Sequence, residues 1–143
     1  MTDRTKDTLG QLLLRAFKWF DQGLLDRLHT KGFPELRRSH SLVFAHLDAG
    51  GTRISELARR IGVSRQAVHE TVGDLRRARL VELVADPTNR SARLVVMTEE
   101  GRRSVRAARR IYADLERELA WRLGPEEVAE LRRVLESDWG APP

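Results

Sequence analysis

Hydrophobic and polar residues follow a helical pattern over most of the chain. Apolar positions recur at helical spacing from Thr8 to about Leu28 and from about Glu99 to Leu123, which predicts two long amphipathic helices. The same spacing predicts shorter helices from Arg38 to Leu47 and from Pro125 onward, after a break at Gly124. The residues expected to face inward on the last helix are Val128, Leu131, Val134 and Leu135. The chain is therefore expected to be mostly α-helical.

Two short helices joined by a tight turn are predicted in the middle of the chain. The first carries one apolar stripe, formed by Ile54, Leu57, Ala58 and Ile61. Gly62 suits a left-handed residue that ends this helix, and Ser64 suits the N-cap of the next. Helices separated by so short a turn cross steeply, and the small Ala58 lets the second helix approach the first. This pattern predicts a helix-turn-helix.

After Leu80 the apolar pattern changes from helical to extended. Val81–Ala85 and Ala92–Met97 are expected to be strands joined by a polar turn at Asp86–Ser91. A hairpin that directly follows a helix-turn-helix is a wing. The sequence therefore predicts a mostly α fold with a small β-hairpin wing.

The helix that follows the turn has two different faces. Ala67, Val68, Val72, Leu75 and Arg79 share one side, which is expected to dock on the preceding helix. Gln and Arg side chains on the other side can hydrogen-bond adenine and guanine in a major groove, whereas arginines further along the helix suit phosphates. The candidate DNA contacts on this helix are Ser64, Arg65, Gln66, His69, Gly73, Arg76 and Arg77.

The hairpin adds two candidate DNA contacts. Arg90 is placed near the tip, where it can enter a minor groove, and Asp86 is expected to hold it by an ion pair. Arg93 is expected near the base of the wing.

Charge supports a polyanionic partner. The formal net charge is +5, and the 14 arginines between Arg53 and Arg110 face only 7 acidic residues. Arginine grips phosphate or guanine bidentately, so double-stranded DNA is the expected partner. The chain has no cysteine, which excludes thiolate metal sites. It also lacks a glycine-rich phosphate loop and a nucleophile elbow, so no enzyme activity, catalytic residue or cofactor is expected.

These segments together resemble the MarR family of winged-helix transcription regulators. The matching residues are 54–68 in the helix-turn-helix, 75–82 before the wing, and 86–101 in the wing and the following helix. Asn89 departs from the family pattern, in which an aspartate precedes the arginine at the position of Arg90. The resemblance implies a winged helix-turn-helix DNA-binding domain flanked by dimerisation helices. Its segments are an N-terminal dimerisation helix at 1–34, the winged domain at 35–100 and C-terminal dimerisation helices at 101–143.

The resemblance also implies a homodimeric regulator, with repression as the expected output, that reads a pseudo-palindromic operator. Such regulators often respond to a small aromatic or anionic effector. The side chains that can line its pocket are Phe17, Trp19, Phe20, His40, Phe44 and Tyr112. No membrane segment or signal peptide is apparent, so a cytoplasmic location is expected.

Two alternatives remain open at this stage. The first is a metal-responsive winged-helix sensor that uses the four histidines, although His40 and His46 do not share a helical face. The second is a winged-helix protein-interaction module without sequence-specific DNA binding, which would hold DNA only by charge.

Overall fold

The computed structural model describes residues 7–143, so the first six residues of the expected 1–34 segment lie outside it. Six helices and one antiparallel hairpin make up this part of the chain, which confirms the predicted mostly α fold with a wing. The elements in chain order are α1 (Leu9–Thr30), α2 (Arg38–His46), α3 (Ile54–Ile61), α4 (Arg65–Arg77), β1 (Val81–Asp86), β2 (Asn89–Met97), α5 (Glu99–Leu123) and α6 (Pro125–Leu135).

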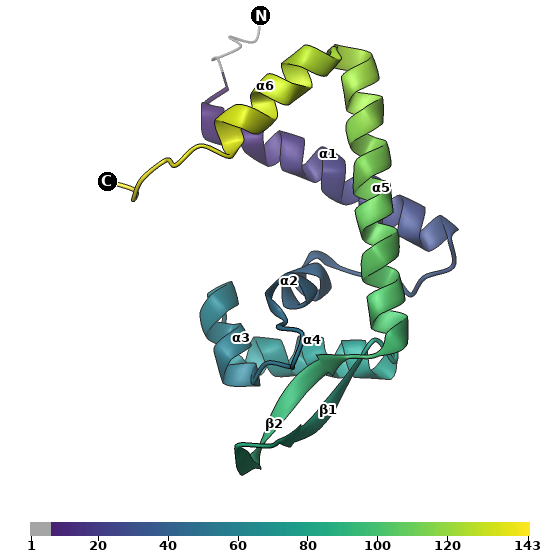
Figure 1. Ribbon diagram of the computed structural model, residues 1–143, viewed down its shortest axis with the longest axis vertical. Coiled ribbons are helices and arrows are strands. Elements are labelled where there is room, and N and C mark those ends of the chain that lie inside the picture. The colour runs from purple at the N-terminus through teal and green to yellow at the C-terminus, as the bar shows by residue number, and fades with distance from the viewer. Residues whose placement is uncertain (1–6) are drawn as a thin grey trace, which may run out of the picture.

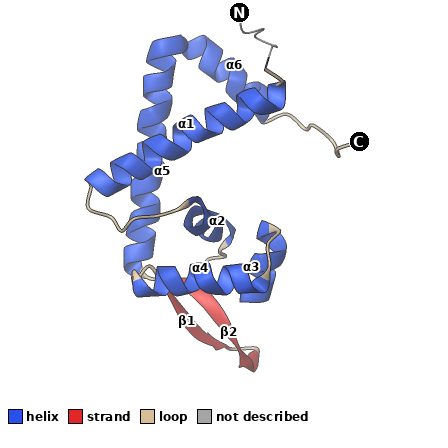
Figure 2. Ribbon diagram, turned by 180° about the vertical axis from the view of Figure 1, so that it is seen from behind, coloured by secondary structure: helices blue, strands red, loops and turns tan. Residues whose placement is uncertain are grey.

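Helix α5 connects two regions of the molecule (Figure 1). Its first turns lie beside the hairpin and α4, and its far end meets α6, while α1 crosses it near the middle. Helices α2, α3 and α4 pack on one another, and α3 and α4 also contact the hairpin, away from α6. The view from behind shows the same division, with the wing projecting from the region that holds α3 and α4 (Figure 2).

Each region has its own core. In the winged region the buried apolar side chains are Val43, Leu57, Ala58, Val68, Val72, Leu75, Leu80, Val81 and Val95. Around the crossing of α1 and α5 they are Leu24, Leu28, Phe33, Ile111 and Leu115. Burial of these side chains, rather than helix propensity, stabilises the short helices α2 and α3, because isolated helices of that length are marginal in water.

The helix-turn-helix forms as predicted. Gly62 has φ 78° and ψ 35°, a left-handed conformation that favours glycine, and its N–H donates to the carbonyl of Ala58. The Ser64 hydroxyl caps α4 by accepting from the N–H of Ala67 at 3.1 Å. Val68 is 1% exposed and faces α3, so the predicted docking side of α4 is confirmed for its apolar residues.

The prediction that placed Arg79 on that docking side is wrong. Helix α4 ends at Arg77, and Arg79 follows with φ 61°, which turns the chain toward β1. Its side chain is exposed. The helical pattern therefore stops two residues earlier than the sequence suggested.

The hairpin turn is shorter than predicted. Asp86 pairs with Asn89 across the strands, which leaves only Pro87 and Thr88 in the loop. The expected turn at Asp86–Ser91 is therefore wrong, because Asn89 and the two residues after it already belong to β2. Thr52 also exchanges backbone hydrogen bonds with Val95 at 3.0 and 2.9 Å, which joins the loop before α3 to the wing.

Much of the apolar surface of α1 and α6 is open. Leu131, Val134 and Leu135 are 43–47% exposed, and α6 has no buried residue. The prediction that this face of α6 points inward is therefore wrong for the single chain. In α1, Leu9 and Phe17 are likewise exposed. None of the helices in residues 7–143 is long and apolar enough to cross a membrane.

Candidate nucleic-acid interface

The outward face of α4 presents its first two turns to solvent. Arg65, Gln66 and His69 are exposed, while Ser64 beside them caps the helix. The Gln66 amide donates to the Glu70 carboxylate at 3.3 Å, so its carbonyl oxygen remains available as an acceptor. These side chains follow the tight turn, at the end of the helix from which a helix-turn-helix reads base edges.

Further along the same face lie Gly73, which has no side chain, and the two arginines Arg76 and Arg77. Gly73 is half-buried, and a Cβ built there would meet only the guanidinium of Arg77, at 3.5 Å. No neighbour within residues 7–143 therefore requires a glycine. Arg76 is exposed and free of ion pairs among residues 7–143, whereas Arg77 is tied to Asp74.

The wing arginines are available, but not in the way the sequence suggested. Arg90 and Arg93 are both exposed, and neither forms an ion pair with another described residue. The Asp86 carboxylate accepts instead from Arg53, at 2.8 Å to Nε and 2.5 Å to Nη2. The expected ion pair between Asp86 and Arg90 is therefore wrong, because Arg53 and Thr88 already occupy this buried carboxylate.

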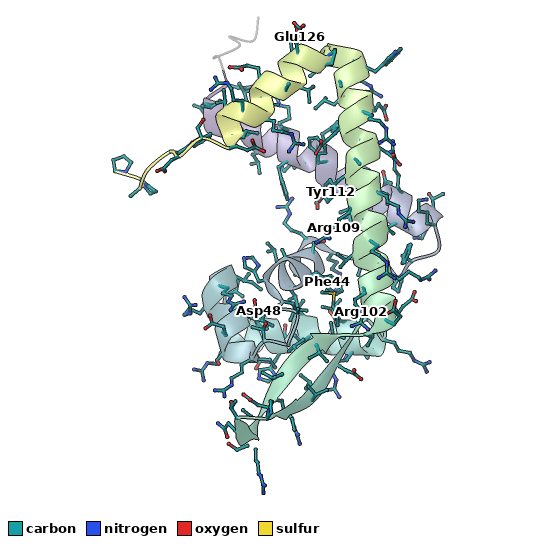
Figure 3. The ribbon with its side chains drawn as sticks, viewed as in Figure 1. Phe44, Asp48, Arg102, Arg109, Tyr112 and Glu126 are labelled. Atoms are coloured by element: carbon teal, nitrogen blue, oxygen red, sulfur yellow. The ribbon has the colours of Figure 1, made fainter. Side chains whose placement is uncertain are left out.

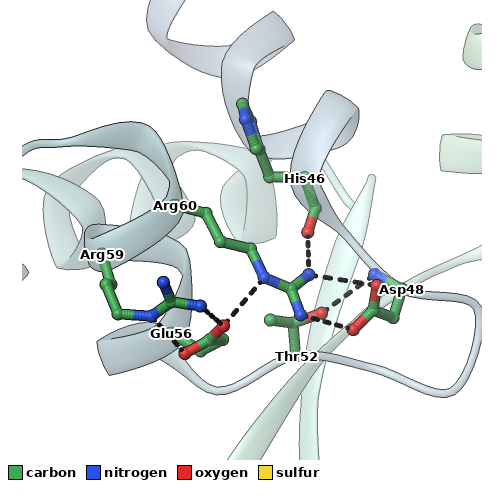
Figure 4. A network of polar contacts seen from close by, with 6 residues as sticks. All are labelled: His46, Asp48, Thr52, Glu56, Arg59 and Arg60. Carbon is green, nitrogen blue, oxygen red and sulfur yellow. Dashed lines mark hydrogen bonds and ion pairs between the residues drawn. The ribbon is translucent and has the colours of Figure 1, made fainter. Parts of the chain in front are cut away.

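The arginines of α3 form ion pairs with carboxylates of the same chain. Arg60 donates to both carboxylate oxygens of Asp48, at 3.0 and 2.9 Å, to the carbonyl of His46 and to Glu56 (Figure 4). Hydrogen bonds from Arg59 and then Arg60 lower the pKa of Glu56 to about 2. This network fastens α3 to the loop after α2 and neutralises charge that would otherwise face solvent.

Free positive charge is consequently concentrated on α4, its end and the wing. The arginines in this stretch that are exposed and unpaired within residues 7–143 are Arg65, Arg76, Arg79, Arg90 and Arg93. In the first turns of α5, by contrast, Arg102, Arg103 and Arg106 are bound to glutamates of the same helix, whereas Arg109 and Arg110 further along are exposed and without an ion pair within residues 7–143. The arrangement suits a polyanion that contacts α4 and the hairpin together.

A second feature is a largely apolar groove of about 500 Å³ lined by α1, α2 and α5. Of the predicted effector residues it brings together Phe17, Phe44 and Tyr112; Figure 3 shows Phe44 on α2 near Arg109 and Tyr112 of α5. Burial, and then the nearby Asp21 carboxylate, raises the pKa of the Tyr112 hydroxyl. An apolar cavity with a few polar groups is the usual form of a small-molecule site.

The other predicted effector residues do not line this groove. Trp19 and Phe20 pack edge to face, with ring centroids 4.9 Å apart, beside the core at the crossing of α1 and α5. His40 is 5% exposed; its Nδ1 accepts from the Arg37 N–H at 2.9 Å, and its Nε2 lies 3.4 Å from Asp74 of α4. His40 therefore links α2 to α4.

The histidines do not gather into a metal site. His46 Nδ1 is 2.7 Å from the carbonyl of Leu42, and no three His, Asp or Glu side chains within residues 7–143 are grouped to hold an ion.

Arg53 is the residue at this surface that the sequence analysis missed. It occupies the N-cap position of α3, where Ser, Thr, Asp or Asn is preferred, and its side chain makes no capping hydrogen bond. An arginine at a cap position was the available signal that this side chain has another partner, but the pattern does not say which one.

Comparison with known proteins agrees with this geometry. A model described as the MarR family matches residues 35–90. The HTH-type transcriptional regulator TcaR of Staphylococcus aureus is 30% identical over 104 residues, which cover 71% of this chain and 69% of TcaR. Proteins from Mycobacterium bovis and Mycobacterium tuberculosis are 43% identical over 54 residues, so the matched part of the chain spans only 38% of their length.

Solved structures share the whole architecture. Apo MarR from E. coli superposes with a TM-score of 0.73 at 22% identity, over 91% of this chain and 96% of that one. The transcriptional repressor CouR, solved with a 23-mer DNA duplex, superposes with a TM-score of 0.72 at 22% identity over 94% of each chain. The fold, the family model and the similarity to TcaR agree, and the chain belongs to the MarR family of transcriptional regulators.

Proposed function

We propose that this protein is a homodimeric repressor that reads a pseudo-palindromic operator through α4 and the wing. The observation that carries the proposal is the concentration of exposed arginines, unpaired within residues 7–143, on α4 and the hairpin, while the arginines of α3 and of the first turns of α5 are paired with carboxylates. Ser64, Arg65, Gln66 and His69 are the base-reading candidates, and Arg76, Arg77, Arg90 and Arg93 the backbone and minor-groove candidates.

A second copy of the chain is the proposed cover for the open apolar faces of α1 and α6. A cavity of about 250 Å³ between them is lined by Phe20, Leu119, Val128, Leu131 and Leu135 together with Glu116, Arg132 and Glu136. Apolar faces of this kind are uncommon on monomers and mark interfaces. In this proposal residues 1–34 and 101–143 form the dimer, and 35–100 bind DNA.

The groove between α1, α2 and α5 is the proposed effector site. Arg38 of α2 lies 3.6 Å from Asp21 of α1 and 4.9 Å from the centre of the Phe17 ring, so it bridges the two walls. An aromatic or anionic molecule that enters here contacts one helix of the proposed dimer and one of the winged region. If this molecule binds more tightly to a dimer whose α4 helices are spaced too far apart or too close for the two half-sites, it reduces DNA binding. The reduction is limited by the difference between its affinities for that dimer and for the DNA-binding one.

Selection of random duplexes by the purified protein, at near-physiological salt, tests the proposal. Enrichment of a palindrome with half-sites about ten base pairs apart supports a dimeric regulator and yields its operator. Retention without enrichment, together with binding that disappears as salt rises, would instead favour the protein-interaction module.

Two substitutions then separate the proposed roles on the selected operator. Arg90→Ala should weaken binding by a similar factor on all sequences, whereas Gln66→Ala should relax the preference at one base pair of each half-site. Arg110→Ala is a matched control, because this exposed arginine belongs to α5 and lines a hollow with Lys31 and Asp114, which includes no residue of α4 or the hairpin. Unchanged affinity in both test variants would contradict the docking proposed here.

A further inference from the structure

The buried carboxylate of Asp86 joins three parts of the winged region. It accepts from Nε and Nη2 of Arg53, and from the N–H and hydroxyl of Thr88 at 2.8 and 2.7 Å. Arg53 precedes α3, Asp86 ends β1, and Thr88 lies in the hairpin turn. One side chain thus connects the helix-turn-helix to the tip of the wing.

The Asp86 end of this connection is buried and fully hydrogen-bonded, whereas the Arg53 side chain is 44% exposed. Asp86 is 5% exposed, and the bonds from Thr88 and then Arg53 lower its pKa to about 2. Both Arg53 nitrogens donate to Oδ2 of Asp86 and Thr88 donates to Oδ1, so each oxygen is bound by a different part of the winged region. Charge-assisted hydrogen bonds of this kind are stronger than neutral ones. The pair therefore constrains where the end of β1 lies relative to α3.

The wing is held to the helix-turn-helix at two heights. Near its base the backbone of Thr52 pairs with Val95, and toward the tip the side chain of Arg53 reaches Asp86. The pairing becomes irregular between Ala85 and Asp86, so backbone pairing alone defines the tip less firmly than the base. Arg90 lies within this irregular stretch of β2, between Asn89, which pairs with Asp86, and Arg93, which pairs with Ala85.

We propose that Arg53 is a positioning residue for DNA binding: its ion pair with Asp86 sets the orientation of the wing tip and so delivers Arg90 to DNA. Arg53 acts through Asp86 and does not itself contact the duplex. The inference rests on the proposed function, because it assumes that Arg90 binds DNA.

A double-mutant cycle on the selected operator tests this role. Arg90→Ala should weaken binding of the wild-type protein about tenfold, but less than about threefold in an Arg53→Ala background, where Arg90 is already misplaced. Gln66→Ala should cause the same loss in both backgrounds, because α4 keeps its packing on α3. Circular dichroism and thermal unfolding identify a temperature at which all variants are folded.

A second variant distinguishes positioning from direct contact. Asp86→Asn retains an acceptor for Thr88 but loses the ion pair, so it should reproduce the pattern of Arg53→Ala. If Arg53 instead binds a phosphate, Asp86→Asn would free its guanidinium and leave or raise the affinity, which would overturn the inference.

The remaining outcomes are also decisive. Equal losses of affinity from Arg90→Ala in both backgrounds would show that Arg53 and Arg90 act independently. A smaller loss from Gln66→Ala in the Arg53→Ala background than in the wild type would show a general structural defect. Either result overturns the positioning role of Arg53 but leaves the proposed function standing. If Arg90→Ala and Gln66→Ala leave wild-type binding unchanged, the proposed function fails, and the inference with it.

Discussion

Replacement of Gly73 by alanine should make the protein more stable and a poorer DNA binder at the same time. Gly73 lies inside α4, whose last residue is Arg77. The nearest atom to a Cβ at this position is Nη1 of Arg77, at 3.5 Å, which is an ordinary van der Waals contact with the end of a flexible side chain. Folding therefore gains nothing from a glycine here.

The stability gain follows from helix propensity. A glycine in a helix interior costs about 0.5–1 kcal/mol relative to alanine, so Gly73→Ala should raise the free energy of unfolding by about that amount. For a chain of this size the midpoint should rise by roughly 2–4 °C per kcal/mol. Thermal unfolding must be compared at one protein concentration, because the proposed dimerisation would make the midpoint depend on concentration.

The expected binding loss has a different origin. The gap at Gly73 lies on the face of α4 that carries His69 and Arg76, so the added methyl group points toward the proposed DNA surface. If the DNA backbone approaches there, the methyl group should weaken operator binding by about 1 kcal/mol or more, which is about fivefold. Fluorescence anisotropy on the selected duplex measures this loss.

Gly10→Ala is the matched control, because a Cβ there meets nothing within 4 Å and the residue lies on α1. Because α1 belongs to the proposed dimer, the control is compared at a concentration at which both proteins sediment alike, and it should then leave operator affinity unchanged. A Gly73→Ala protein that gains stability and binds the operator as tightly as wild type would refute the close approach of DNA. A loss of stability would refute the packing of α4.

Three further outcomes are expected. A Cβ at Gly101 would lie 2.1 Å from the carbonyl oxygen of Leu80, so Gly101→Ala should lower the free energy of unfolding by about 1–3 kcal/mol in urea titrations. Leu131 is 43% exposed in the single chain, so Leu131→Asp should remove about 0.6–1.3 kcal/mol of apolar burial per chain from the proposed dimer and shift sedimentation toward monomer. The pKa of Glu56 falls from 4.5 to about 2 on folding, so the stabilisation that its carboxylate provides is complete above pH 4.5 and is lost as the pH drops toward 2. In acid unfolding, the free energy of unfolding of Glu56→Gln should therefore fall less than that of the wild type over this pH range.

Local signals in the sequence were sufficient for the helix-turn-helix and for the long helix after the wing. Gly62, Ser64 and Thr98 have the conformations or capping bonds that their residue types favour, and these depend on neighbours within a few positions. The pattern failed where a local preference was weak. Arg79 continues the apolar side of α4 on a helical wheel, yet the chain has already left the helix there.

The pattern of hydrophobic and polar residues could not predict contacts between residues that lie far apart in the sequence. Asp86 is 33 residues from Arg53 and only four from Arg90, so proximity in sequence favoured the wrong partner. The polar residues around Asn89 indicated a loop, although Asn89 pairs with Asp86 and the two residues after it belong to β2. The exposure of Leu131 is a further case, because helical spacing shows that a face is apolar but not whether the same chain covers it.

The distribution of charge connects the two halves of the proposed mechanism. Residues 53–110 carry 14 basic and 7 acidic side chains, whereas the rest of the chain carries 12 basic and 14 acidic ones. Two copies that associate through α1 and α6 therefore bring together segments of nearly balanced charge, so association meets little repulsion. Their positive surfaces stay on α4 and the wing, where Arg65 and Arg90 remain unpaired within residues 7–143. A strongly basic surface for the proposed operator and a stable dimer are thus compatible, because internal ion pairs such as Arg60 with Asp48 neutralise arginines outside the proposed DNA-binding surface.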